Sequence, residues 1–326
     1  MLRFVVDTMG GDAGSGICVD AIINFLKKNP DCEIVAVGKE EELSKLQGIC
    51  RIVDARDVVP MEAGALEVMR MKNSSMMVAL KLLKEEGLDG IISSGSTGGF
   101  LSASTITLKM IPGVKRAALV APFPTKIKGK KVVILDIGAN NENSPEELVQ
   151  FAHMGRLYSQ GVYGLKEPTL YLLSNGSEDA KGAPEVKGAH KLLKENDFPN
   201  FKGNIEARDV LLGEADIVVS DGFSGNVFLK GAEGVASIMS KMMKSAFKKN
   251  LWTKLGYLHV RKGIKEMSET MDYKSTGGAM LLGINGVVVK AHGSSDAYAF
   301  ECAINVAKKL AEANIVSKIK EGFENA

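Results

Sequence analysis

The residues with the clearest capacity for chemistry lie between Ala215 and Lys230. The apolar run Ile217–Val219 is typical of a strand buried in a parallel sheet, and the loop Ser220–Asn226 follows at the carboxyl end of that strand. A helical pattern comes next. Because such a loop and helix N-terminus present backbone N–H groups, the stretch predicts a phosphate-binding corner. An ordinary capped strand-to-helix turn, with Asp221 as loop residue, fits the same residues.

Small polar loops also follow other apolar runs, at Ser93–Gly99, Asp136–Asn141, Ser174–Gly176 and Gly203–Glu206. The first has neither the Gly-Lys-Ser/Thr ending of a P-loop nor the G-x-G-x-x-G fingerprint, so nucleotide binding is not favoured. A single Asn-Gly turn is usually only a turn. Because ligands of open α/β sheets bind outside the carboxyl ends of the strands, we expect these loops to converge on one crevice.

One histidine has a position suited to proton transfer. His292 follows the apolar run Val287–Val289 and precedes glycine and serines, where it could donate a hydrogen bond or a proton; a loop histidine with only structural partners is an equal alternative. His153 and His190 fall within helical patterns, which favours structural roles. The chain lacks a G-x-S-x-G elbow, so we expect no covalent serine nucleophile.

Composition restricts the class of protein. The chain has 326 residues, 45% of them hydrophobic, and a formal charge of only +2, so the total charge gives no indication of a nucleic-acid partner. The 4 cysteines form no C-x-x-C pair, which argues against zinc and against a disulfide framework. With no signal peptide and no apolar run of about 18 residues, we expect a cytoplasmic protein that does not span a membrane.

Apolar strand patterns and helical patterns alternate along the chain, which predicts an α/β fold with a mostly parallel sheet and helices on both faces. We expect one continuous domain over residues 1–326, with an appended helical subdomain at about 234–272. The expected strands are Leu2–Val6, Ile34–Val37, Ile49–Val53, Asp89–Ile92, Ala117–Val120, Val132–Leu135, Thr169–Leu172 and Ile217–Val219. The expected early helices are 14–28, 39–46, 62–71 and 76–86.

The subdomain has a basic amphipathic pattern. Apolar residues recur on one helical face from Val235 to Phe247, lysines lie largely outside that face, and no Asp or Glu occurs between Glu233 and Glu266. This pattern predicts contact with an anionic membrane or a partner, and a Met-rich dimer interface is the alternative. The residues expected at the contact are Lys248, Lys249, Leu251, Trp252 and Leu255.

Motifs spread over nearly the whole chain resemble, in the same order, those of the PlsX phosphate acyltransferase family. Thr8, Ser96 and Met280 depart from that pattern, in which alanine, asparagine and proline are usual at these positions. The matching motifs are Asp7–Asp12 (DTMGGD), Met69–Met76 (MRMKNSSM), Ser93–Gly99 (SSGSTGG), Leu135–Asn140 (LDIGAN), Leu173–Gly182 (LSNGSEDAKG), Gly203–Glu206 (GNIE), Asp221–Lys230 (DGFSGNVFLK) and Gly277–Ser294 (GGAMLLGINGVVVKAHGS).

The resemblance implies transfer of a fatty acyl group from acyl carrier protein to inorganic phosphate, giving acyl phosphate for phospholipid synthesis. It implies a fold similar to phosphotransacetylases and isocitrate dehydrogenases, a homodimer, and no metal or other cofactor. It places Lys181 and His292 near phosphate and oxyanion, with Asn226 and Asn140 as orienting amides. The predicted catalytic residues are Lys181, Asn226 and His292. The predicted substrate-binding residues are Gly10, Gly11, Asp12, Gly95, Ser96, Thr97, Gly98, Asn140, Asn175, Asn204, Glu206, Asp221 and Lys230.

Other functions compete with this one. Coenzyme A could replace acyl carrier protein, as in phosphotransacetylases. An NAD-dependent decarboxylating dehydrogenase would need an aspartate cluster for a metal and an arginine-rich pocket, and the sequence indicates neither. A non-catalytic membrane-associated scaffold would explain the basic helices but not the polar loops. We expect a cytoplasmic enzyme that associates peripherally with the inner face of the membrane, with acyl carrier protein as a further candidate for the basic surface.

Overall fold

The computed structural model describes residues 1–270 and 276–324. Its strands are β1 (Leu2–Asp7), β2 (Cys32–Gly38), β3 (Arg51–Asp54), β4 (Gly90–Ser93), β5 (Ala118–Pro124), β6 (Lys131–Leu135), β7 (Leu170–Ser174), β8 (Phe201–Glu206), β9 (Ile217–Val219), β10 (Ala279–Leu282) and β11 (Val288–Lys290). Its helices are α1 (Ser15–Lys28), α2 (Ala65–Arg70), α3 (Ser75–Glu85), α4 (Thr97–Leu108), α5 (Pro145–Tyr163), α6 (Pro184–Glu195), α7 (Gly222–Lys248), α8 (Leu251–Thr270), α9 (Ala297–Glu312) and α10 (Ile315–Glu324), with short 3₁₀ turns at Ser44–Leu46 and Val210–Leu212.

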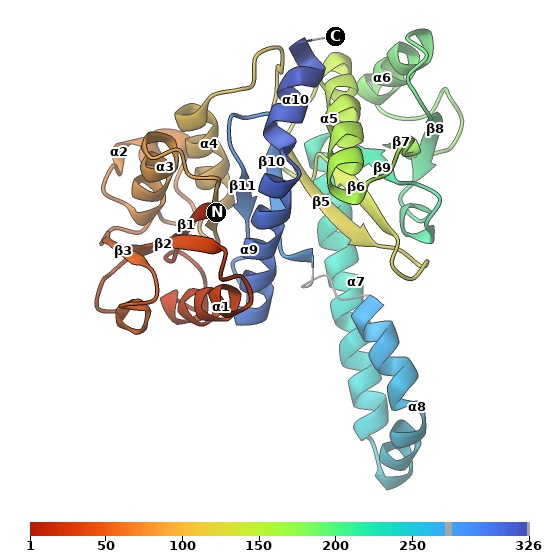
Figure 1. The fold of residues 1–326 in the computed structure, drawn as a ribbon. Coiled ribbons are helices and arrows are strands. Elements are labelled where there is room, and N and C mark those ends of the chain that lie inside the picture. Colours follow the sequence, from red (N-terminus) through yellow and green to blue (C-terminus); the bar gives the residue numbers. More distant parts are fainter. Residues whose placement is uncertain (271–275, 325–326) are drawn as a thin grey trace.

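All the described strands join one sheet, in the order β3-β2-β1-β4-β11-β10-β5-β6-β9-β7-β8 (Figure 1). Pairing is parallel from β3 to β11 and again from β6 to β8. The pairs β11–β10, β10–β5 and β5–β6 are antiparallel. The sheet therefore consists of two parallel halves that run in opposite directions, with β10 and β5 between them. The predicted mostly parallel sheet is confirmed.

Helices cover both faces of the sheet, as the alternating pattern predicts. In β1, Phe4 and Val6 belong to one core, which also contains side chains of α1, α5, α6, α9 and α10. Val5, between them, belongs to the core under α2, α3 and α4. Strand side chains alternate between faces, and burying one Val or Phe stabilises the fold by about 1.5–3 kcal/mol. β1, which has apolar residues on both of its faces, is therefore buried between the two layers of helices.

The structure differs from the predicted elements in three places. The segment expected as a helix over 39–46 has only a 3₁₀ turn, Ser44–Leu46, in which Leu46 is buried. β8 was not predicted because its sequence, FKGNIE, mixes polar residues and glycine, a composition tolerated at the edge of the sheet where it lies. β10, a run of four residues, also escaped prediction.

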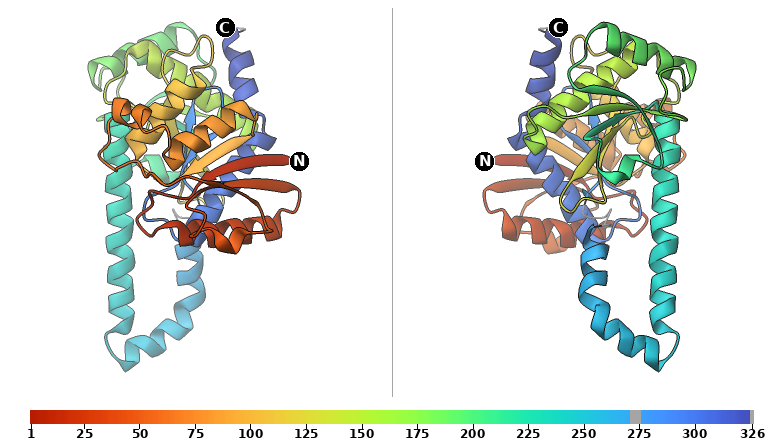
Figure 2. Two further views of the ribbon diagram at one scale, coloured as in Figure 1. Left: turned by 90° about the vertical axis from the view of Figure 1, so that its left-hand side faces the viewer. Right: turned by 90° about the vertical axis from the view of Figure 1, so that its right-hand side faces the viewer.

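α7 and α8 form a hairpin that projects away from the sheet (Figures 1 and 2). Near its tip the rings of Phe247 and Tyr257 contact each other at an interplanar angle of 59°, with centroids 5.4 Å apart, and the Thr253 hydroxyl donates to the Phe247 carbonyl at 3.1 Å. α7 is continuous from Gly222, so the hairpin is an extension of a helix that begins at the sheet. Residue 272, the expected end of the subdomain, lies outside the described residues. None of the described helices combines the length and apolar character needed to cross a bilayer.

Candidate active site

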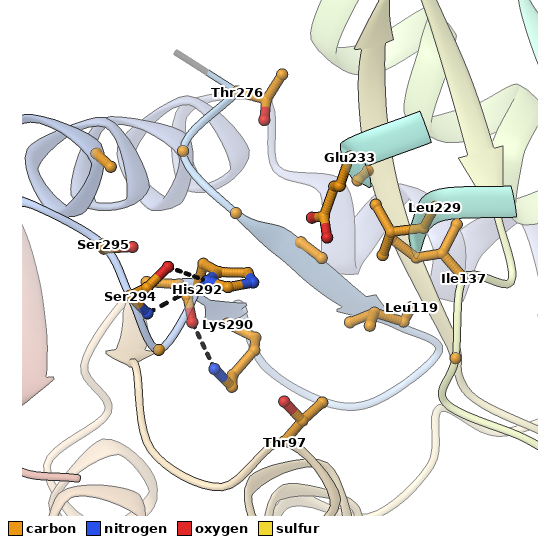
Figure 3. A pocket seen from close by; sticks show the side chains of 18 of the residues that line it. Thr97, Leu119, Ile137, Leu229, Glu233, Thr276, Lys290, His292, Ser294 and Ser295 are labelled. Carbon is orange, nitrogen blue, oxygen red and sulfur yellow. Dashed lines mark hydrogen bonds between the residues drawn. The ribbon is translucent and has the colours of Figure 1, made fainter. Parts of the chain in front are cut away.

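A cavity of about 520 Å³ lies over β5 and β10, where the two halves of the sheet meet (Figure 3). Such a volume is typical of small-molecule sites. Its polar side chains include Asp12, Thr97, Asn226, Lys230, Glu233, Lys290, His292, Ser294 and Ser295. Its apolar side chains include Met61, Leu119, Ala121, Phe123, Ile137, Leu229 and Ala279. The cavity thus has a polar end and an apolar wall.

The loops that follow β1, β4 and β11 pack closely together at the polar end. A Cβ atom built on Gly10, where φ is +84°, would lie 3.0 Å from Cα of Gly95, so the loop after β1 could not carry a side chain there without moving the loop after β4. A Cβ on Gly11 would lie 2.7 Å from the Ser94 hydroxyl. The Asp12 N–H donates to the Gly293 carbonyl at 2.9 Å. The structure therefore brings the predicted residues Gly10, Gly11, Asp12 and Gly95 together, and of these Asp12 lines the cavity.

α4 begins beside these loops and points its first turn at the cavity. The Ser96 hydroxyl accepts from the Gly99 N–H at 3.3 Å and donates to the Met61 carbonyl at 2.9 Å, so this buried side chain caps the helix and is not among the cavity-lining residues. Thr97 and Gly98, in the first turn, do line the cavity. A capped helix of 12 residues offers first-turn N–H groups and a positive dipole end to an anion.

The start of α7 does not form the anion-binding corner that the sequence suggested. Asp221 caps the helix by accepting from the Ser224 N–H at 2.8 Å, and the Gly222 N–H donates to the Asn143 side chain at 3.2 Å. A Cβ at Gly225 would lie 1.9 Å from the Asp136 carbonyl oxygen, so this glycine permits close packing against the preceding loop. The N–H groups of Gly222, Ser224 and Gly225 are occupied within the chain, as in the alternative of an ordinary capped turn.

Side chains further along α7 reach the cavity instead. Asn226, Leu229, Lys230 and Glu233 recur at helical spacing and all line it. The Lys230 ammonium forms an ion pair with Glu233 at 3.3 Å. The charge of Lys230 is therefore paired within α7. The side-chain amide of Asn226, one turn earlier, is an uncharged donor that lines the same cavity.

Asn140 has a structural position. Its Nδ2 donates to the Asp136 carboxylate at 2.7 Å and to the Ala117 carbonyl at 2.8 Å. Asp136 is fully buried, and it also accepts from the Leu119 N–H at 2.9 Å and the Gly138 N–H at 3.0 Å. Burial raises the pKa of Asp136, while these hydrogen bonds oppose the rise. Asn140 therefore fixes the loop that carries Gly138, and it does not line the cavity.

The predicted residues of the loops after β7 and β8 form a separate cluster. The Asn204 amide donates to the Glu178 carbonyl at 2.8 Å and the Lys181 carbonyl at 3.4 Å, and Asn175 accepts from the Gly182 N–H at 3.0 Å. These side chains do not line the cavity, and neither does Glu206, which pairs with Arg208 at 3.1 Å.

The expectation that all strand-end loops converge on one crevice is wrong for this cluster. Neighbouring strands lie about 4.8 Å apart, so β7 and β8, the third and fourth strands beyond β5, lie about 14 Å and 19 Å from it. Within one chain the structure separates Lys181 from Asn226 and His292.

His292 extends into the cavity from the loop after β11 (Figure 3). Its Nδ1 accepts from the Ser294 N–H at 3.2 Å and lies 2.8 Å from the Ser294 hydroxyl. Because Nδ1 is the acceptor of a backbone N–H, the neutral ring carries its proton on Nε2. Nε2 is therefore a hydrogen-bond donor available to a ligand.

Lys290 is a buried cavity residue that sequence reasoning missed, as it also missed Glu233, Ser294 and Ser295. It is the last residue of β11, only 7% exposed, and its ammonium donates to the carbonyls of Ser94 and Ala291. Burial lowers the pKa of Lys290 to about 8. In the sequence, Lys290 could have been found from its position directly after the apolar run Val287–Val289. A lysine at the end of a buried strand is seldom buried itself unless its ammonium group has a partner.

Comparison with solved structures defines the class of fold. A phosphotransacetylase from Streptococcus pyogenes superimposes with a TM-score of 0.62 at 18% sequence identity, covering 96% of this chain and 94% of that one. The fold is therefore that of the phosphotransacetylases, as the sequence predicted. Among the described residues, no group of three or more His, Cys, Asp or Glu side chains is arranged to hold a metal ion.

Sequence comparison gives the family. The model of the family described as "Fatty acid synthesis protein" matches residues 2–318. A phosphate acyltransferase of Helicobacter hepaticus is 41% identical over 330 residues, covering 100% of this chain and 98% of that protein. One of Clostridium novyi is 40% identical over 331 residues, covering 99% of each. The chain belongs to this family, which confirms the predicted family and class of enzyme.

Proposed function

We propose that this enzyme transfers a fatty acyl group from the thioester of acyl carrier protein to inorganic phosphate. The observation that carries the proposal is the cavity itself, in which a polar end built from glycine loops and the start of α4 meets an apolar wall from β5 and α7. Phosphate fits the polar end, and the first carbons of an acyl chain fit the wall.

The reaction needs little covalent help from the protein. A phosphate oxygen attacks the thioester carbonyl carbon, the new C–O bond forms, and the carbonyl oxygen becomes an oxyanion. A lone pair of the oxyanion then re-forms the C=O bond, the C–S bond breaks with its electron pair going to sulfur, and the thiolate leaves and takes up a proton. Positioned phosphate and donors aimed at the oxyanion supply the catalysis.

Roles follow from the geometry. The first-turn N–H groups at Thr97 and Gly98 face the phosphate, while Nε2–H of His292 and the amide of Asn226 donate to the oxyanion. The wall of Leu119, Ile137 and Leu229 receives the acyl chain. The proposed catalytic role of Lys181 rests on the family motif alone.

The α7–α8 hairpin is proposed as the contact with an anionic membrane. Leu251 and Trp252 at its tip are 71% and 81% exposed, and Lys248, Lys249 and Lys254 lie beside them. Basic residues near an anionic surface contribute about 1 kcal/mol each, and interfacial Trp and Leu add burial of apolar area. Peripheral attachment at the inner face of the membrane would release the acyl phosphate where a membrane enzyme could use it.

Two further contacts are proposed for the hairpin. Along α7, the side chains of Val235, Ile238, Met239 and Met242 are exposed, and an apolar stripe of this kind fits a homodimer interface. The lysines could also receive the acidic surface of acyl carrier protein. Analytical ultracentrifugation of wild type and Met239→Glu plus Met242→Glu tests the dimer, which the variant should weaken.

The proposed donor is tested by offering acyl carrier protein thioester and acyl coenzyme A in separate reactions with phosphate. Faster formation of acyl phosphate from the carrier-protein thioester supports the proposal. Turnover with coenzyme A alone would favour the second candidate, a phosphotransacetylase reaction.

A further inference from the structure

Lys290 presents a buried positive charge at the floor of the cavity, with its side chain directed below His292 (Figure 3). At 7% exposure it is among the least accessible charged side chains of the described chain. Lysine is rarely buried to this extent without a partner, because removing an ammonium group from water is costly. The hydrogen bonds of the Lys290 ammonium group therefore decide whether its charge is satisfied within the protein.

An ammonium group has three N–H donors and no acceptor. Two of them are used by the carbonyls of Ser94, at 3.3 Å, and Ala291. No other hydrogen bond and no ion pair of Lys290 occurs among the described residues. One charged donor is therefore left unpaired in a group that lines the cavity.

Charged groups nearby do not neutralise it by contact. Asp7, on β1, is buried and accepts from the Ser93 hydroxyl at 2.7 Å and the Met9 N–H at 3.2 Å. Burial raises the pKa of Asp7, while its hydrogen bonds and the Lys290 charge oppose the rise. Asp12, from the loop after β1, attracts the ammonium from a distance, and Lys230 on α7 repels it. Asp12 and Glu233 line the cavity together with Lys230 and Lys290, so the attraction for an anion comes from the unpaired Lys290 donor and the start of α4 and not from a net positive charge.

We propose that Lys290 binds the phosphate substrate directly, with its third N–H donating to a phosphate oxygen. The inference rests on the proposed function for the identity of the anion. It adds a substrate-contacting cation that lines the same cavity as Thr97 and Gly98, so that both a charge and a helix start would contact the phosphate. A residue needed only to tie the loops of Ser94 and Ala291 together would not need a charge facing the cavity.

Titration calorimetry with inorganic phosphate tests this on the intact enzyme. Lys290→Met should weaken phosphate binding by about 10- to 100-fold, the effect of losing one hydrogen bond to a charged group. The matched control is Lys131→Met, which removes a half-buried lysine from the start of β6, outside the cavity, and should bind phosphate like the wild type. Equal phosphate affinity of Lys290→Met and wild type, or no phosphate binding by the wild type, would overturn the proposal.

A measurement on the wild type alone covers the case in which the variant does not fold. Sulfate keeps its charge over the pH range of interest, so its binding reports the protein groups. The sulfate dissociation constant should rise from about pH 8 upward, as Lys290 loses its proton. His292 and Lys230 also line the cavity, and Lys230 is paired with Glu233 at 3.3 Å. A dissociation constant that stays flat from pH 7.5 to 9.5 would contradict a role for Lys290.

Failure of the inference and failure of the proposed function give different results. An enzyme that binds phosphate through Lys290 but forms no acyl phosphate would retain the anion site and lose the proposed reaction. An enzyme that forms acyl phosphate with the Lys290→Met variant at an unchanged KM for phosphate would retain the reaction and lose the role of Lys290.

Discussion

Asn226 of α7 lies directly against Gly138 of the loop after β6, so closely that a Cβ atom at position 138 would stand 3.2 Å from its side-chain amide carbon. Gly138 also has a φ of +128°, which side chains rarely permit. The loop is in turn fixed by Asp136. The position of the Asn226 amide is therefore set by a backbone conformation that only glycine adopts easily.

Gly138→Ala should displace the Asn226 amide and lower turnover by up to about 10²-fold, because groups near reacting atoms tolerate little misplacement. Gly129→Ala is the control: Gly129 also has a positive φ, +80°, but a Cβ there meets nothing within 4 Å. Both variants should lose about 1–3 kcal/mol of stability from backbone strain. Steady-state kinetics with thermal unfolding distinguishes them, and equal turnover in the two variants would contradict the role of the contact.

Asn226→Ala should lower kcat by about 10²- to 10³-fold, the usual effect of removing one oxyanion donor. The substitution removes no core volume, so the unfolding transition should be retained. Asn196→Ala, at the end of α6, is the control for losing an asparagine elsewhere. Near-wild-type kcat in Asn226→Ala would remove this amide from the reaction.

Lys181→Ala should lower turnover by about 10²-fold or more if the family motif carries its catalytic role to this chain. The side chain is exposed, and no ion pair of its ammonium occurs in the part of the chain that the structure describes, so folding should survive. Lys187→Ala, an exposed lysine of α6, is the matched control. Unchanged kinetics in Lys181→Ala would mean that Lys181 is not catalytic. The catalytic groups would then lie within the cavity of one chain.

Lys290 also makes stability depend on pH. Its pKa is about 8 in the folded protein, against about 10.4 in an unfolded chain, so the unfolded state binds more protons between these values. The free energy of unfolding of the wild type, relative to Lys290→Met, should therefore rise between pH 8 and pH 10.4, by about 2–3 kcal/mol. Urea titrations at fixed ionic strength measure this difference. A difference that does not change with pH would contradict the buried position of the charge.

Trp252→Glu plus Leu255→Glu should abolish sedimentation with anionic vesicles while leaving activity on soluble substrates intact. The control is Leu66→Glu plus Leu212→Glu, which adds the same charge at exposed leucines outside the hairpin. Binding of the wild type should weaken as salt is added. If the wild type does not sediment with anionic vesicles even at low salt, the membrane contact is wrong.

Patterns of single strands and helices could be predicted from the sequence, and so could the grouping of Gly10 with Gly95. The direction of each half of the sheet could not, because an apolar run such as Val132–Leu135 reads alike whether its neighbour is parallel or antiparallel. That direction decides which loops meet, and it separates Lys181 from His292. Asn140 illustrates a second limit: an amide at a strand end can serve the loop itself instead of a ligand.

The most direct test of the central claim is acyl phosphate formation from purified acyl carrier protein thioester and ¹⁸O-labelled inorganic phosphate, in the presence of a chelator. The account predicts thiol release that depends on phosphate, and an acyl phosphate that retains the label in the bond to the acyl carbon. Release of unlabelled free fatty acid, or no product above the level without enzyme, would contradict it.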